Sequence, residues 1–134
     1  MVQNVLDQFP NRAIKVYVVW EPIRLFDREA AARKSSALVT DRRARHFWAP
    51  DLKLATRVKT PIALATGPAW DVYLLYAANA KWIGPDVPVP ADFMHQLSGR
   101  LPDNDLLDGP ELTRRLRNLV DGVSVIEPAI VPRR

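Results

Sequence analysis

The chain has 134 residues, a formal net charge of +4, 48% hydrophobic residues and 25% charged residues, which is an ordinary composition for one globular domain. Cysteine is absent, and this excludes disulfides, thiolate catalysis, iron–sulfur clusters and thiolate zinc sites. No apolar run approaches the roughly 18 residues that span a bilayer, and no secretory signal opens the chain. We therefore expect a cytoplasmic protein without membrane association.

The first third of the chain predicts a helix, a strand and a second helix. Apolar residues at helical spacing over residues 1–9 predict the first helix, which Pro10-Asn11 ends. Residues 13–20 are the densest β-branched and aromatic run in the chain, so they predict a buried strand that Glu21-Pro22 closes. Asp27 is a suitable N-cap for a helix through Val39.

The middle of the chain predicts short elements joined by turns. Residues 45–48 form a second strand, residues 52–58 a helix, and Trp70–Tyr76 a third strand. The corner at residues 77–79 predicts a hairpin into residues 80–83. Three prolines make residues 84–92 a surface loop, and residues 91–97 form one helical turn.

The clearest helix begins at Gly109-Pro110 and ends at Gly122. Its apolar residues form one buried face, and Arg114, Arg115 and Arg117 lie away from that face. Residues 123–131 are apolar enough to pair as a strand, although Pro128 restricts them to an edge. We therefore divide the chain into a domain over residues 1–122 and a tail over residues 123–134, and the element order predicts an α/β fold with a mixed sheet.

Four segments together resemble an uncharacterised bacterial family of thioredoxin-like proteins: residues 16–22 (VYVVWEP), 41–48 (DRRARHFW), 69–76 (AWDVYLLY) and 93–97 (FMHQL). The resemblance runs from about Val2 to Leu97, and more loosely through the last helix. It implies a three-layer α/β/α thioredoxin-like mixed sheet. It also implies that any redox activity would depend on a Cys-x-x-Cys pair between the first central strand and the next helix.

The sequence departs from that family at the decisive place. The central strand and the dithiol would precede Met1, so the domain is expected to be N-terminally truncated and its redox activity cannot be carried over. Pro68 is the nearest counterpart of the family's cis-proline. The missing strand would lie between residues 16–20 and Trp70–Tyr76, which leaves two apolar edges facing a gap.

Three arrangements would close this gap. The two strands pair directly, the tail over residues 123–131 fills the position, or a second chain donates an edge. We expect the first or the third, because Pro128 suits a central strand badly.

Two segments are candidate binding sites. Trp20, Glu21 and Pro22 end the opening strand, where ligands of open α/β sheets bind; alternatively, Trp20 caps the core and Pro22 only ends the strand. Pro68 precedes the third strand, and Trp70 and Asp71 begin it. Asp71 is either an acid–base group with a raised pKa or a strand-start residue that bonds loop amides.

The remaining candidates predict no cofactor and no metal. His46 and His95 have no second ligand at suitable spacing, no serine lies in a nucleophile motif, and no glycine-rich phosphate loop is present. Arg42, Arg43 and Arg45 form a basic run that is either a solvated face or an anion site.

These observations predict a non-redox thioredoxin-like domain that binds a protein partner or itself through an open sheet edge, and not an enzyme. One alternative is the downstream part of a thiol–disulfide oxidoreductase with a misassigned start. Another is a weak anion or nucleic-acid binder, although the basic residues are not gathered into one patch with aromatic residues.

Overall fold

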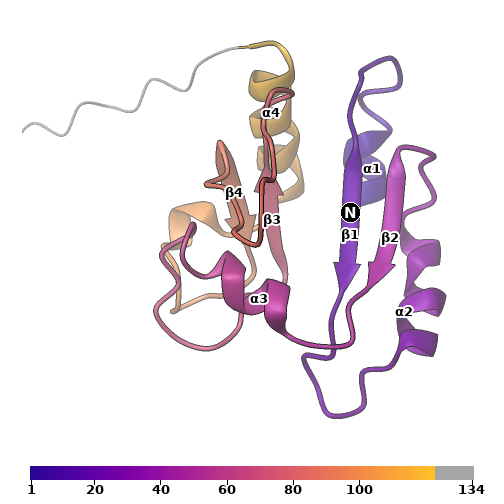
Figure 1. The fold of residues 1–134 in the computed structure, drawn as a ribbon. Helices are drawn as coiled ribbons and strands as arrows, with labels where there is room; N and C mark the ends of the chain where they lie inside the picture. The colour runs from indigo at the N-terminus through magenta and orange to yellow at the C-terminus, as the bar shows by residue number, and fades with distance from the viewer. Residues whose placement is uncertain (123–134) are drawn as a thin grey trace, which may run out of the picture.

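The computed structural model describes residues 1–122, which form a mixed α/β fold (Figure 1). The expected α/β class is therefore confirmed. In chain order the elements are α1 (Val2–Leu6), β1 (Val16–Trp20), α2 (Glu29–Ser35), η1 (Ser36–Leu38), β2 (Ala44–Trp48), α3 (Lys53–Val58), β3 (Val72–Leu75), β4 (Asp92–His95), η2 (Asp103–Asp105) and α4 (Gly109–Val120).

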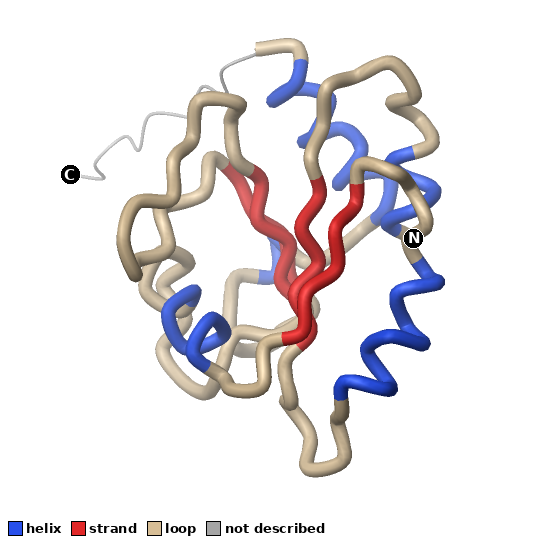
Figure 2. The backbone as a smooth tube through the Cα atoms, turned by 45° about the vertical axis from the view of Figure 1, so that its right-hand side comes forward, coloured by secondary structure: helices blue, strands red, loops and turns tan. Residues whose placement is uncertain are grey.

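The four strands form two separate two-stranded sheets. β1 pairs with β2 in parallel, with Val16 opposite Ala44, and β3 pairs with β4 antiparallel, with Val72 opposite His95. β1 and β3 are the inner strands and lie next to each other with opposite directions, while β2 and β4 lie outside them (Figures 1 and 2). No ladder of hydrogen bonds joins β1 to β3 in residues 1–122.

Helices cover both faces of the β3–β4 sheet. On one face, Tyr73 and Leu75 pack against a core cluster that α1, α4 and β4 share: Val5, Phe9, Met94 and Leu112. On the other face, Val72 and Leu74 pack against a second cluster from α3 and the loops around the sheet: Val58, Ile62, Leu64, Ala69, Leu97 and Leu101. Apolar side chains are therefore packed on both faces of this sheet.

The β1–β2 sheet is covered on one face only. The ring of His46 is bonded to the Val39 carbonyl at 3.0 Å, so the segment that follows η1 lies on the half-buried face. The opposite face carries Tyr17, Val19 and Phe47, which are 61%, 37% and 48% exposed. Three layers were expected throughout, and this half of the chain does not have them, because α3 packs on the β3–β4 side.

The partner of β3 differs from the sequence-based prediction. We expected a hairpin into residues 80–83, whereas β3 pairs with β4, in the segment expected to form a helical turn. Trp82 and Ile83 are 52% and 79% exposed, while Met94 and His95 are fully buried. The strand assignment follows from burial and pairing, which the short apolar run of residues 93–97 does not reveal alone.

The second helix is shorter than predicted and begins later. Its N-cap is Arg28, not Asp27, whose carboxylate accepts a hydrogen bond from the Arg24 amide at 2.7 Å. This bond closes a turn before the helix. A short acidic side chain can either close such a turn or cap a helix, and Asp27 does the first. Only Ala32 is buried along α2.

α4 agrees with its prediction except at Arg115. Asp108 caps it by accepting a hydrogen bond from the Glu111 amide at 2.9 Å, and Pro110 lies in the first turn. The Arg115 side chain is only 12% exposed, because its guanidinium lies between Asp92 and Asp105. The expectation that Arg115 points to solvent is therefore wrong.

Three further observations complete the description of the fold. No peptide bond is cis in residues 1–122, so the bond before Pro68 is trans. Among the same residues, no helix has the length and apolar content needed to cross a bilayer. The predicted tail over residues 123–134, including its edge strand, lies outside the described residues.

Candidate functional site

The inner edge of β1 offers free backbone groups. The Val16 amide donates to the Arg43 carbonyl at 3.0 Å, and the Trp20 carbonyl accepts from the Ala49 amide at 2.9 Å. Successive residues of a strand direct their backbone groups to opposite edges. Tyr17 and Val19 therefore direct their N–H and C=O groups toward β3, and these groups have no partner in the part of the chain that the structure describes.

The inner edge of β3 is open in the same way. The Asp71 carbonyl accepts from the Gln96 amide at 3.0 Å, and the Leu75 carbonyl accepts from the Ala91 amide at 2.8 Å. Odd-numbered residues thus bond to β4, and Val72 and Leu74 direct their backbone groups toward β1. We call the region between these two edges the open position, bounded by the backbones of Tyr17, Val19, Val72 and Leu74.

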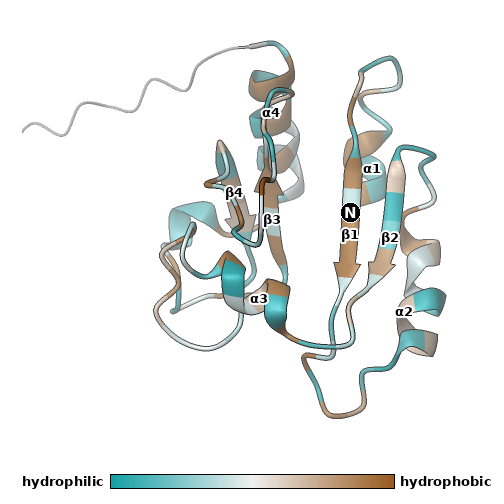
Figure 3. Cartoon of the chain, in the orientation of Figure 1, coloured by the Kyte–Doolittle hydropathy of each residue, from teal (hydrophilic) through white to brown (hydrophobic). Residues whose placement is uncertain are grey.

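The absence of pairing between β1 and β3 in residues 1–122 excludes one of the closures that we expected. Direct pairing of the strands at residues 16–20 and 72–75 is wrong, because each is bonded only to its outer neighbour in residues 1–122. β1 is also mostly apolar (Figure 3). An apolar strand with an unpaired edge is a template for another strand.

The two predicted binding segments meet at one residue of α3. The Ala55 amide donates to the Glu21 carboxylate at 3.0 and 3.3 Å, and the Ala55 carbonyl accepts from the Ala69 amide at 3.0 Å. Trp20–Pro22 and Pro68–Asp71 are therefore close to each other at the same end of the open position. Ala55 itself is 1% exposed and was not predicted as part of this site.

Glu21 holds the beginning of α3 in place. Burial raises the pKa of its carboxyl above the ordinary value, and hydrogen bonds from the Ala55 and Leu54 amides oppose this rise. A carboxylate that accepts helix N-terminal amides compensates the positive end of the helix. Glu21 thus joins the end of β1 to α3 in a structural role.

Asp71 lies at the beginning of β3 in a left-handed backbone conformation, with a φ of 50°. Short polar side chains tolerate this conformation better than most residues do. Its side chain is exposed, and the carboxylate accepts no hydrogen bond from residues 1–122. The expected bond to loop amides is therefore wrong: the carbonyl of Asp71, not its carboxylate, makes the contact at this position.

Trp20 is fixed by His46. Its indole N–H donates to His46 Nδ1 at 3.3 Å, and the two rings stack with an interplanar angle of 12°. A neutral His46 with its proton on Nε2 satisfies both this bond and the bond to the Val39 carbonyl. Trp20 is half-buried and belongs to neither core cluster, so its expected role as a cap of the core stays a prediction.

His95 is likewise structural. It is fully buried, its Nδ1 accepts from the Leu97 amide at 3.0 Å, and its Nε2 is bonded to the Pro102 carbonyl at 3.0 Å. Within the described residues, no group of three or more histidine, aspartate or glutamate side chains is placed to hold a metal ion.

Arg43 in the predicted basic run is neither solvated nor free for an anion. It contacts Asp41 at 2.6 Å and donates to the carbonyl of Leu6 at the end of α1 and to those of Phe9 and Arg12 in the segment that follows. The hydrogen bonds that Arg43 donates to the Asp41 carboxylate lower the pKa of that group to about 2. The expectation of a solvated face remains correct for Arg42 and Arg45, which are exposed.

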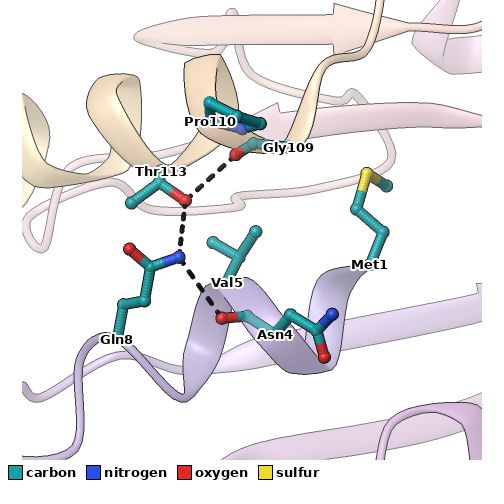
Figure 4. Close-up of a pocket in the computed structure, with 7 residues that line it drawn as sticks. All are labelled: Met1, Asn4, Val5, Gln8, Gly109, Pro110 and Thr113. Carbon is teal, nitrogen blue, oxygen red and sulfur yellow. Dashed lines mark hydrogen bonds between the residues drawn. The ribbon is translucent and has the colours of Figure 1, made fainter.

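A groove of about 650 Å³ lies between α1 and α4 (Figure 4). Gln8 donates to Thr113 Oγ1 at 3.3 Å, and that hydroxyl donates to the Gly109 carbonyl at 3.0 Å. Met1, Asn4, Val5 and Pro110 complete its lining. No charged side chain is among the residues that line this groove.

Sequence reasoning found the gap and both flanking segments but missed which residues bound it. Tyr17, Val19, Val72 and Leu74 are defined by the alternation of hydrogen bonds along each strand. The alternation can be worked out once the outer partner of each strand is known. The sequence alone does not identify the partner of β3.

The chain matches no protein-family model, and comparisons with curated proteins and with solved structures find no significant match.

Proposed function

We propose that this chain is a non-redox thioredoxin-like domain that binds protein by accepting a β-strand in the open position. The observation that carries the proposal is the pair of unpaired edges on β1 and β3, which face each other in one molecule. Strand addition supplies affinity through main-chain hydrogen bonds and specificity through alternate side chains. The resemblance to thioredoxin-like proteins supports the same view, since their central strand would lie between the strands corresponding to β1 and β3.

The free energy of backbone hydrogen bonding favours binding of a strand at the open position. Four residues each present one backbone donor and one acceptor at the open position, and a satisfied backbone bond contributes about 0.5–1.5 kcal/mol. β3 is packed on both faces, as an internal strand is, yet in the described part of the chain it pairs on one edge only. A strand at this position would also shield the half-buried β1.

Amide hydrogen exchange tests the proposal residue by residue. Without a partner, the amides of Tyr17 and Val19 should exchange faster than those of Val16 and Val18, which donate to β2. A bound strand should slow exchange at Tyr17 and Val19 and leave the other two unchanged. Equally slow exchange at all four positions in the isolated protein would contradict an open edge.

The two alternatives, a redox protein with a misassigned start and an anion or nucleic-acid binder, stay predictions. No contact in residues 1–122 favours either over strand binding.

A further inference from the structure

We infer that the open position takes a lone extended segment of about five residues, with both of its own edges free, an apolar middle and opposite charges at its two ends. This inference rests on the strand-acceptor function proposed above. It names the chemistry of the partner: a peptide segment outside any sheet of its own.

The two facing edges require a segment that is not already part of a sheet. β1 and β3 lie on either side of the open position, so a strand there pairs on both of its edges (Figure 1). A strand within a folded sheet has a neighbour on one edge, and that neighbour would overlap β3 or β1. The same argument excludes β1 of a second copy, because β2 already occupies its outer edge.

The length and the apolar middle follow from the flanking strands. β1 has five residues and β3 has four, which sets the length of a matching ladder at about five. Ile14 packs on the same core cluster as Tyr73 and Leu75, so alternate side chains of the segment face the apolar layer of α1 and α4. β-Branched apolar residues at those alternate positions suit this environment.

The charges expected at the two ends of the bound segment follow from charged residues at the two ends of the open position. Lys15 is exposed immediately before β1, whereas Asp71 is exposed immediately before β3. Because β1 and β3 run in opposite directions (Figure 1), the residues that precede them in the chain lie at opposite ends of the open position. Glu21 lies at the Asp71 end. A segment with an acidic residue near Lys15 and a basic residue near Asp71 therefore complements the site.

Calorimetric titration of the full chain with synthetic peptides tests the inference. The reference probe has one glutamate, five alternating valines and threonines, and one lysine; control probes carry glutamate at both ends or lysine at both ends. We expect the reference peptide to bind about two- to fivefold more tightly than either control. Lys15→Glu makes both ends of the site acidic, so it should reverse the order of the reference peptide and the control with lysine at both ends. An order that Lys15→Glu leaves unchanged would overturn the assignment of charges.

N-methylated peptides test whether both edges take part. Methylation of alternate peptide amides blocks the bonds to one flanking strand, and methylation of the other set blocks the bonds to the second strand. We expect each set to weaken binding by at least tenfold. If only one set matters, the peptide adds to a single edge: the lone-segment inference then fails, and the strand-acceptor function stands.

A matched pair of protein variants supplies the second measurement. Val19→Pro removes the amide that faces the open position, and Val19→Ala keeps that amide and shortens the side chain. We expect Val19→Pro to weaken binding about tenfold and Val19→Ala to change it less than threefold. Equal loss in both would overturn the backbone pairing. Because the N-methylated peptides modify only the ligand, they decide the question even if Val19→Pro does not fold.

Sedimentation at increasing protein concentration tests whether a second copy of the chain occupies the open position. A dimer that the reference peptide dissociates would identify a second copy as the occupant and overturn the inference of a separate partner. A monomer that binds the peptide would support it. Failure of every peptide to bind, together with slow exchange at Tyr17 and Val19, would overturn the proposed function as well.

Discussion

The two sheets of this domain invert the usual relation between hydrophobic sequence and burial. β1 reads Val-Tyr-Val-Val-Trp, yet none of its residues is fully buried; β4 reads Asp-Phe-Met-His, yet Met94 and His95 are completely buried. The difference lies in what surrounds each strand. β4 lies among α4, α1 and β3, whereas β1 has one partner strand and one covered face. Hydrophobicity makes burial favourable, but the number of neighbouring elements decides whether it occurs.

The comparison also indicates where function lies. A domain of this size gains stability by burying apolar surface, so an apolar strand left half-buried is retained at a cost. In the β3–β4 half, apolar clusters pack on both faces of the sheet. In the β1–β2 half, the most apolar strand faces the open position. We associate stability with the first half, and we place binding between the halves, with one strand edge from each.

Truncation of a side chain on each sheet should give the largest difference in the free energy of unfolding between the two halves. Met94→Ala should lower the free energy of unfolding by about 2–5 kcal/mol, because it leaves a cavity among fully packed side chains. Tyr17→Ala on the exposed face of β1 should change it by no more than about 0.5 kcal/mol. Urea denaturation measures both values. Similar losses would contradict the contrast between the two sheets.

The second largest effect is the difference in stability between replacing a buried and replacing an exposed arginine of α4. Arg115→Met removes the cation that binds Asp92, Asp105 and Glu111, and should cost about 2–3 kcal/mol because these partly buried carboxylates then repel one another. Arg114→Met is the control, since Arg114 is 60% exposed and its single ion pair contributes at most about 0.5 kcal/mol. Chemical denaturation of both variants in the same buffer compares them, and equal losses would contradict the burial of Arg115.

Each half carries one carboxyl group whose pKa an arginine lowers to about 2: Asp41 beside Arg43, and Glu111 beside Arg114 and Arg115. Each pKa lies below its unfolded value, near 4, so the stabilisation is complete above that value and is lost as the pH falls toward 2. We expect Asp41→Asn and Glu111→Gln each to make the acid loss of stability shallower. Unfolding free energies at several pH values between 5 and 2 measure this, and unchanged slopes would argue against the ion pairs.

The smallest expected effect is a gain. Ala63 has a φ of 56° and an exposed side chain, so Ala63→Gly should relieve backbone strain without loss of packing. Glycine enters this region freely, but it also raises the entropy of the unfolded chain, so the net gain is up to about 1 kcal/mol. Thermal unfolding detects such a change. A lower melting temperature would show that Ala63 is not strained.

Local sequence determined the elements whose stability is local. The apolar β-branched run of residues 16–20 forms β1, and the cap at Asp108 with Pro110 in the first turn begins α4. The absence of cysteine by itself excludes thiol chemistry in this chain. These conclusions follow from propensity, capping and composition, which act over a few residues.

Only the tertiary structure decided which strands pair, which arginines are buried and where the sheet stays open. The β3–β4 ladder joins segments separated by a long proline-containing loop, Arg115 meets carboxylates from β4 and η2, and Ala55 connects the ends of two distant strands. Each of these features satisfies backbone or charged groups with partners far along the chain. Periodicity cannot show such partners. It showed an apolar strand at residues 16–20, and the fold showed that the inner edge of this strand has no partner within residues 1–122.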